Sequence, residues 1–147
     1  MRSLFPLLPP LLCFFVGVVM YLLPSMGQYP TFPYLISGFI LLSACIGMLS
    51  LWQFHQHKTT IDPQRLDKST HLVTSGIFRV SRNPMYLSLL LLLMAWALYL
   101  GHFLAWSGVV AFILLMNRFQ IAREEIYLER KFGEAYRQYQ AKVRRWL

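Results

Sequence analysis

The placement of the charged residues constrains this chain more than any other feature of its sequence. Residues 3–57 contain no Asp, Glu, Lys or Arg, and residues 83–117 contain none either. A helical crossing of a membrane requires roughly 20 apolar residues, so the two blocks together predict an all-α integral membrane bundle of about four transmembrane helices. Charged residues make up only 14% of the chain, against roughly 25% in soluble domains. A water-soluble globule is therefore excluded.

The expected spans are residues 4–23, 33–54, 84–100 and 103–117. Pro9 and Pro10 are expected to kink the first span or to delay its start. The last two spans are short, since 17 residues rise about 25 Å and the membrane core is about 30 Å thick. Snorkelling side chains or local thinning would absorb the difference. Apolar positions keep a helical period beyond the fourth span, which predicts a cytoplasmic C-terminal helix with Gly133 as an interruption or cap.

The basic residues predict how the spans are oriented. The net charge is +8, and all 14 Lys and Arg fall at Arg2, within residues 58–82 or within residues 118–145. Basic residues concentrate on the cytoplasmic side of membrane proteins. Four crossings place every one of them there with both termini cytoplasmic, whereas a single crossing over residues 83–117 would place eight of them outside. This multi-pass arrangement explains the charge without a nucleic-acid partner.

The chain is long enough for one domain, and we expect residues 1–147 to form a single membrane-embedded unit. One Arg before an apolar run resembles a signal peptide, but no small-residue cleavage site follows Leu23, so a retained first helix is expected. Cys13 and Cys45 lie within expected spans and are predicted to be reduced thiols without a catalytic role. Four His residues are too few for a multi-histidine membrane metal centre. No metal is expected.

The segment Arg82-Asn83-Pro84-Met85-Tyr86 predicts a helix start at the membrane surface. Asn is a favoured N-cap and a residue before Pro avoids helical geometry, so Asn83 should cap a helix that begins at Pro84. The helix N-terminus offers free N–H groups and a partial positive charge. With Arg82 beside it, the corner would bind an anion. A well-made helix start with a snorkelling Arg explains the same residues, and both interpretations remain open.

Two adjacent acids, Glu124 and Glu125, follow the last expected span. Ionisable groups so close to a membrane are candidates for function. Neighbouring residues lie about 100° apart on a helix, so at most one of the two should point squarely into a given site. A salt-bridged amphipathic face is the alternative. Glu129 and Glu134 are expected to be solvated partners of nearby basic residues at i, i+4 spacing.

Three other segments have simpler interpretations. Residues 55–82 are too long for an unstructured connection in a compact domain, and their end mixes apolar and small residues as an ordered segment would. Ser43 and Gly47 form a small-xxx-small step, which favours close helix packing. The basic tail, residues 137–145 with Tyr136, Tyr139 and Trp146, is interpreted as a contact with anionic lipid through aromatic interface anchors.

Together these stretches resemble the isoprenylcysteine carboxyl methyltransferase family, which is related to the phospholipid N-methyltransferases. The resemblance covers residues 71–146. Residues 71–78 (HLVTSGIF) are similar to the family's L-V-T-x-G-[PV]-[YF] segment, and residues 82–86 (RNPMY) to its R-[HN]-P-x-Y signature. Glu124-Glu125 with the downstream Phe-Gly and paired Tyr residues are similar to its E-E-x-x-L…F-G-x-x-Y-x-x-Y ending. Many members have His in place of Asn83, which argues against an imidazole base here.

The resemblance implies a membrane bundle that encloses S-adenosylmethionine and transfers its methyl group to a lipid-like acceptor at the cytoplasmic face. It implies catalytic roles for Arg82, which would orient the acceptor or the cofactor, and for Glu125, which would take a proton from an amine acceptor. Tyr86 would close the site. The implied cofactor-binding residues are His71, Leu72, Val73, Gly76, Phe78, Asn83, Pro84, Tyr86, Glu124 and Glu125. Tyr136 and Tyr139 are assigned mainly to packing of the tail.

Two alternatives remain open at this point. A nicotinamide-dependent membrane reductase shares a similar C-terminal helical architecture, although the R-N-P-x-Y and E-E motifs fit methyltransferases better. A non-enzymatic membrane subunit or lipid-binding scaffold would explain the composition but leave the charged motifs as coincidence. The expected partners are membrane lipids and an amphiphilic acceptor that bears a carboxylate, an amine or a thiol.

Overall fold

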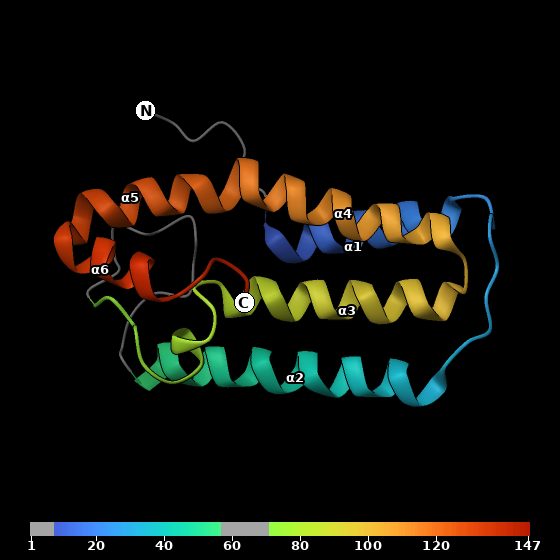
Figure 1. The fold of residues 1–147 in the computed structure, drawn as a ribbon, viewed down its shortest axis with the longest axis horizontal. Coiled ribbons are helices and arrows are strands. Elements are labelled where there is room, and N and C mark those ends of the chain that lie inside the picture. The colour runs from blue at the N-terminus through green and yellow to red at the C-terminus, as the bar shows by residue number, and fades with distance from the viewer. Residues whose placement is uncertain (1–7, 57–70) are drawn as a thin grey trace.

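The computed structural model describes residues 8–56 and 71–147. Within these ranges the chain is all-α and forms no strand, as expected. Helices α1, α2 and α3 lie side by side with a long helix that runs from α4 through a π-helical segment into α5 (Figure 1). Two short 3-10 helices, Gly76–Arg79 and Phe103–Ala105, precede α3 and α4. The helix bounds are α1 Pro9–Leu22, α2 Pro33–Gln56, α3 Pro84–Leu100, α4 Trp106–Leu115, the π-helical segment Met116–Ile121, α5 Ala122–Phe132 and α6 Glu134–Lys142.

The helix ends follow the local sequence closely. Pro9 is the first residue of α1, so the paired prolines delay the helix instead of kinking it, because a fixed φ suits the first helical turn. Residues 4–7 of the expected first span lie outside the described residues. Helix α3 has the predicted bounds and ends at Gly101, whose φ of 69° favours glycine. Gly133, with φ 54°, separates α5 from α6 as predicted.

The side chain of Asn83 does not cap α3, which corrects the prediction. The Asn83 carbonyl accepts a hydrogen bond from Leu87 N (2.9 Å), as an N-cap carbonyl does. Its Nδ2, however, donates to the main-chain oxygen of Arg145 (3.0 Å). A tertiary partner has replaced the local one. Asn83 therefore ties the C-terminal tail to the start of α3.

Helix α3 is the centre of the bundle, with α2 on one side and α1 and α4 on the other (Figure 1). Trp96 Nε1 donates to the Gly17 carbonyl (3.0 Å) and joins α3 to α1. Gly108 allows α1 and α4 to approach, because a Cβ there would lie 2.2 Å from the side chain of Met20. These contacts place the apolar core along α1, α3 and α4.

Helix α2 packs on α3 partly through its small residues, with Ile46 buried between the helices. Ser43 Oγ donates to the Ser88 carbonyl on α3 (2.7 Å), and Gly47 faces Ser88. The small-xxx-small step is thus confirmed as a packing contact. Large apolar side chains cover the rest of α2, with Leu41 66% and Met48 63% exposed. Exposed apolar surface of this kind fits a lipid-facing helix.

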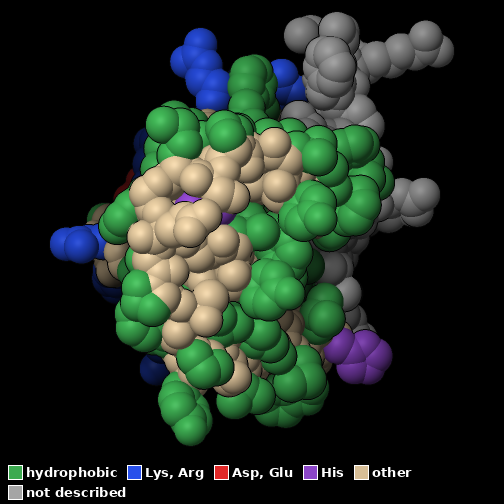
Figure 2. Space-filling view, turned by 90° about the vertical axis from the view of Figure 1, so that its right-hand side faces the viewer, with side chains coloured by type: hydrophobic (Ala, Val, Ile, Leu, Met, Phe, Trp, Pro, Cys, Tyr) green, Lys and Arg blue, Asp and Glu red, His purple; other side chains and the backbone are tan. Residues whose placement is uncertain are grey.

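Two helices are long and apolar enough to cross a membrane, α2 and the continuous helix Phe103–Phe132. Helices α1 and α3 are apolar but shorter. Figure 2 looks onto the end of the bundle made by the two turns that precede α2 and α4, where hydrophobic side chains and backbone dominate and Lys and Arg show only at the rim. The turns are joined by Tyr29 N to Gly101 O (2.9 Å) and Phe103 N to Gly27 O (3.1 Å). Helices α5 and α6 and their charges lie at the opposite end (Figure 1).

Candidate functional site

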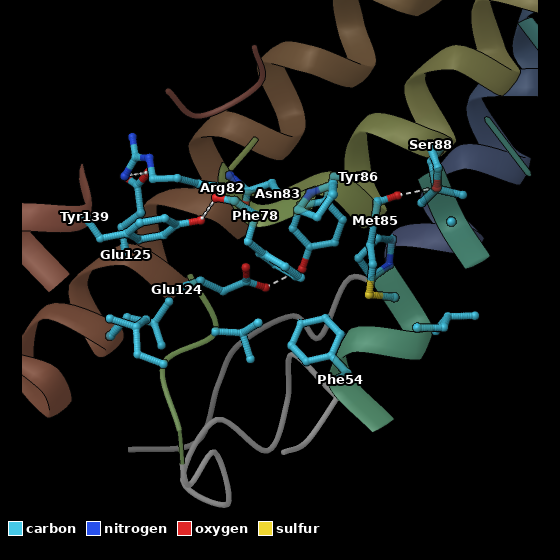
Figure 3. A pocket seen from close by; sticks show the side chains of 18 of the residues that line it. Phe54, Phe78, Arg82, Asn83, Met85, Tyr86, Ser88, Glu124, Glu125 and Tyr139 are labelled. Atoms are coloured by element: carbon cyan, nitrogen blue, oxygen red, sulfur yellow. Dashed lines mark hydrogen bonds and ion pairs between the residues drawn. The ribbon is translucent and has the colours of Figure 1, made fainter. Parts of the chain in front are cut away.

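A cavity of about 530 Å³ lies at the charged end of the bundle, between the starts of α1 and α3, the end of α2, and α5 and α6. The structure gathers around it residues that are far apart in the sequence (Figure 3). Of the expected site residues, those that line the cavity are His71, Leu72, Val73, Phe78, Arg82, Asn83, Pro84, Tyr86, Glu124 and Glu125. His71 is exposed, whereas Val73, Phe78 and Tyr86 are buried.

Gly76 is the one expected site residue that does not line the cavity. Its φ is 56°, and a Cβ there would overlap the side chain of Gln53, at 1.5 Å from Nε2. Gly76 therefore allows residues 71–79 to lie against the end of α2. Phe78 then packs edge-on against Phe54, with ring centroids 5.2 Å apart. Its role in the described structure is to bring this segment to the cavity wall.

Arg82 and Arg145 share one carboxylate. Arg82 Nη1 lies 3.0 Å from Glu125 Oε1, and Arg145 donates to both Glu125 oxygens, from Nη2 at 2.6 Å and from Nε at 3.0 Å. Arg82 Nε and Nη1 are buried and make no hydrogen bond to any described residue, so the Arg82–Glu125 pair rests on proximity alone. Buried N–H groups of a guanidinium are costly to leave unpaired. The arrangement favours an anion in the cavity.

Glu124 has a different environment. Its Oε1 accepts hydrogen bonds from the Tyr86 hydroxyl and from Gln120 Nε2 (2.6 Å). It lies in the charged stretch after the uncharged residues 103–117, outside the apolar part of the long helix. Burial raises the pKa of Glu124 from 4.5 to about 7, against the opposing effect of the two hydrogen bonds. A carboxyl group with this pKa exchanges a proton readily near neutral pH.

Both Glu124 and Glu125 line the cavity, where at most one of them was expected to point squarely into a given site. The two side chains still diverge, as neighbours on a helix must. Glu124 reaches Tyr86 on α3, while Glu125 reaches Arg82, in the segment before α3 (Figure 3). The cavity is wide enough to include both directions. The sequence did not indicate that one cavity is wide enough to be lined by both side chains.

Tyr136 and Tyr139 pack the tail, as expected, and they also line the cavity. Tyr139 donates its hydroxyl hydrogen to the Phe78 carbonyl (2.6 Å), which joins α6 to the segment before α3. Burial raises the pKa of Tyr136, and the nearby charge of Glu125 raises it further, whereas Arg82 lowers it. Tyr136 therefore belongs to the same electrostatic group as Arg82 and Glu125.

Leu128, from the E-E-x-x-L pattern, also lines the cavity. The remaining cavity residues come from the start of α1, from α2 and from the first turns of α3. They are Leu8, Pro9, Pro10, Gly47, Leu51, Phe54, Met85, Ser88 and Leu89. Met85 belongs to the RNPMY segment and Gly47 to the packing step with Ser43, but none of the nine was expected to be a site residue. These residues form the apolar end of the cavity.

The prediction that the tail contacts lipid needs correction at four residues. Tyr136 and Tyr139 are buried and are therefore not interface anchors. Arg145 is paired with Glu125, and Trp146 Nε1 donates to Asn117 Oδ1 (3.1 Å), so neither side chain is directed to lipid. Glu129 also differs from expectation, since it pairs with Arg137 across the Gly133 break (2.7 Å) rather than at i, i+4 spacing. Arg144 and Lys142 are exposed, and their contact with lipid stays a prediction. The described residues contain no group of three metal-binding side chains.

The sequence is similar to those of known methyltransferases. The sequence pattern of the phospholipid methyltransferase family matches residues 33–135, from α2 into α6. The chain is 30% identical over 109 residues to the protein-S-isoprenylcysteine O-methyltransferase of Schizosaccharomyces pombe, an alignment that covers 72% of this chain and 45% of the yeast protein.

It is also 70% identical over 63 residues to an uncharacterized protein of Haemophilus influenzae, covering 43% of this chain and all of that protein. No solved structure matches the chain. The family pattern covers α2, α3, α4 and α5. The matched residues include Arg82, Glu124 and Glu125 of the cavity wall. The chain belongs to the phospholipid methyltransferase family.

Proposed function

We propose that the protein transfers the methyl group of S-adenosylmethionine to a lipid-like acceptor at the cytoplasmic membrane face. The observation that carries the proposal is Arg82, a buried cation with free N–H groups, in one cavity with two carboxylates. The volume of about 530 Å³ falls in the range of small-molecule sites. S-adenosylmethionine has a carboxylate, an ammonium group and an adenosine, and the cavity offers a partner of matching chemistry for each.

The polar end of the cavity would hold the charged groups of the cofactor. Arg82 and the free N–H groups at the start of α3 suit a carboxylate. Glu124 suits the ammonium group or a ribose hydroxyl, because its second oxygen, Oε2, is not used by Tyr86 or Gln120. Val73 and Phe78 are buried apolar residues of the wall and suit the face of an adenine ring.

The apolar end would hold the chain of the acceptor. It lies along α3, between the start of α1 and the end of α2. A second cavity of about 620 Å³ follows on the same helix, between α1 and α2, and its lining is apolar apart from a thiol and tyrosine hydroxyls. Leu89 lines the first cavity, and Leu92 and Leu93 line the second. An acceptor entering from the membrane between α1 and α2 would bring its polar head to Arg82.

When bound, the cofactor supplies an electrophilic methyl group, and the residues of the chain align the acceptor with it. Alignment contributes much of the rate in such an in-line displacement. A carboxylate or thiolate acceptor needs only orientation and desolvation, without a general base. An amine acceptor must lose a proton, and Glu124 is better suited to take it than Glu125, because both oxygens of Glu125 are already engaged by Arg82 and Arg145.

The proposal includes four crossings with both termini cytoplasmic. The turns before α2 and α4 carry no Lys or Arg. Arg82, Glu124 and Glu125 line the cavity at the other end of the bundle, where α5 and α6 lie (Figure 1). Helices α1 and α3, with 14 and 17 residues, are short for a full crossing. Thinning of the membrane around them would bring the cavity mouth to the cytoplasmic surface.

The test is a titration of the detergent-purified protein with S-adenosylmethionine by calorimetry, beside an equal titration with NADPH. Saturable binding of S-adenosylmethionine is expected, and Glu124→Ala should weaken it while Glu129→Ala, on the same helix but outside the cavity wall, should not. Binding of NADPH instead would support the reductase. Binding of neither by folded protein would remove the enzymatic proposal.

A further inference from the structure

The last five residues of the chain form part of the support of the cavity wall. The main chain of the tail is tied to the segment just before α3: Arg82 N donates to the Arg144 carbonyl (3.0 Å), and Asn83 Nδ2 donates to the Arg145 carbonyl (3.0 Å). Ser81 is buried and its hydroxyl lies 3.4 Å from the same carbonyl. The tail and the Arg82 segment are therefore positioned as one unit.

The side chains of the tail are tied to the long helix instead. Arg145 donates to Glu125 through Nε and Nη2, and its Nη1 reaches Asn117 Oδ1 (3.4 Å). Trp146 Nε1 donates to the same Asn117 oxygen. Asn117 belongs to the π-helical segment, a local widening of the helix that is often found at functional sites. One Arg side chain thus bridges this segment and the carboxylate that faces Arg82.

Arg145 changes what Arg82 can do. A carboxylate and a guanidinium favour a pair of parallel hydrogen bonds, and Glu125 makes such a pair with Arg145. Arg82 is left with an approach to one oxygen, and its Nε and Nη1 have no hydrogen-bond partner among the described residues. Arg145 itself does not line the cavity. Its effect on a ligand must pass through Glu125.

We infer that Arg145 is a positioning residue, which holds Glu125 in a bidentate pair so that the N–H groups of Arg82 stay available to an anionic group in the cavity. This inference rests on the proposed function. Without Arg145, Glu125 would be free to turn and form the bidentate pair with Arg82. The cation would then be satisfied by the protein and would bind a carboxylate poorly.

The test compares Arg145→Ala with Arg144→Ala, a substitution of the neighbouring exposed arginine that keeps the carbonyl bonded to Arg82. Arg145→Ala should weaken S-adenosylmethionine binding roughly ten- to a hundred-fold, as misplacement of an orienting group does. Guanidinium ion added at millimolar concentration should restore part of the loss. Arg144→Ala should bind like wild type. The same two variants are also compared in vesicles of increasing anionic lipid content. If both lose S-adenosylmethionine affinity equally, and the loss depends on the anionic lipid, the inference would be overturned in favour of a lipid-binding tail.

A second measurement separates this inference from the proposed function and does not require the cofactor. The melting temperatures of wild type, Arg145→Ala, Glu125→Gln and the double variant form a double-mutant cycle. The shift of the double variant should differ strongly from the sum of the two single shifts. Additive shifts would overturn the inference, whether or not the cofactor binds. Wild-type protein that shows the coupling but binds no S-adenosylmethionine would contradict the proposed function alone. If Arg145→Ala does not fold, Arg145→Lys replaces it, and unchanged binding in that variant would also count against a bidentate role.

Discussion

The two ends of the cavity are built on different principles. At the polar end, Arg82 and Glu125 come from separate parts of the chain, and Arg145, from a third part, holds Glu125 from outside the cavity by two hydrogen bonds. At the apolar end, the wall is formed by neighbouring helices that meet through small residues such as Gly47, and the bonds between them are few. The polar end leaves little freedom in how a charged group is placed. The apolar end restricts only the width of what enters.

This difference teaches which part of a ligand each end can recognise. Directional bonds select a charged group with a defined geometry, because a misplaced partner leaves a buried charge unpaired. Apolar contacts discriminate weakly between chains that differ by one methylene. We therefore expect the protein to be strict about the cofactor and the reacting head, and tolerant of the acceptor's chain. Four substitutions test that division, from the largest expected effect to the smallest.

Arg82→Ala removes the cation that lines the polar end and should lower S-adenosylmethionine affinity by at least about a hundred-fold, because the carboxylate of the cofactor would be left without its charged partner. Calorimetric titration measures the change. Arg79→Ala, an exposed arginine in the preceding 3-10 helix, is the matched control and should bind normally. Wild-type affinity in Arg82→Ala would show that the polar end does not bind the cofactor.

Gly47→Leu places a side chain in the apolar end and should act on the acceptor alone. Methyl transfer to long-chain alkyl thiols or fatty acids should fall about ten-fold relative to short-chain ones, because the cavity is shortened. Cofactor affinity should stay within two-fold. The control is Gly38→Leu on the same helix, where an added Cβ meets nothing within 4 Å. An equal loss for short and long chains would mean that the two ends are not independent.

Glu124→Gln tests the cost of burying a carboxylate at the polar end. The raised pKa means that the folded protein keeps a proton on Glu124 up to about pH 7, whereas the unfolded chain loses it near pH 4.5. The contribution of Glu124 to stability is therefore lost as the pH rises from 4.5 to 7. The variant lacks this loss. Its stability advantage over wild type should grow between pH 5 and pH 8, by at most about 3 kcal/mol.

Thermal unfolding at several pH values measures the advantage of Glu124→Gln. The control is Glu134→Gln, at an exposed position in α6, whose unfolding curve should run parallel to that of wild type. Parallel curves for Glu124→Gln as well would indicate that the carboxylate is solvated and that its place at the polar end carries no electrostatic cost.

Ser43→Ala has the smallest expected effect and tests the packing that supports the apolar end. It removes the hydrogen bond from α2 to the Ser88 carbonyl on α3, and comparable bonds between membrane helices contribute about 0.6 kcal/mol. Ser37→Ala is the control, since Ser37 bonds only to Pro33 within α2. A loss above about 2 kcal/mol for Ser43→Ala would mean that the apolar end is held as rigidly as the polar end.

Local sequence was sufficient for the elements of the fold. Uncharged blocks and prolines predicted the bounds of α3 and the start of α2 to the residue, since a helix start depends on the φ of Pro and on its missing N–H. The motif residues were also predicted to share a site, and ten of them line one cavity. The predictions that failed assumed that a polar side chain bonds to residues close to it in the sequence. Asn83 was expected to cap its own helix, and it bonds instead to Arg145, 62 positions away.

The sequence by itself therefore determined the helices, the apolar surface and the residue types that meet at the charged end, because periodicity, capping preference and charge act over a few positions. Only the tertiary structure decided how the charges are shared: Glu125 between Arg82 and Arg145, Glu124 with Tyr86, and Gly76 against Gln53 instead of in the cavity. The physical reason is that a buried charge must find a partner wherever the packed helices place one, and that position depends on the crossing of all the helices together.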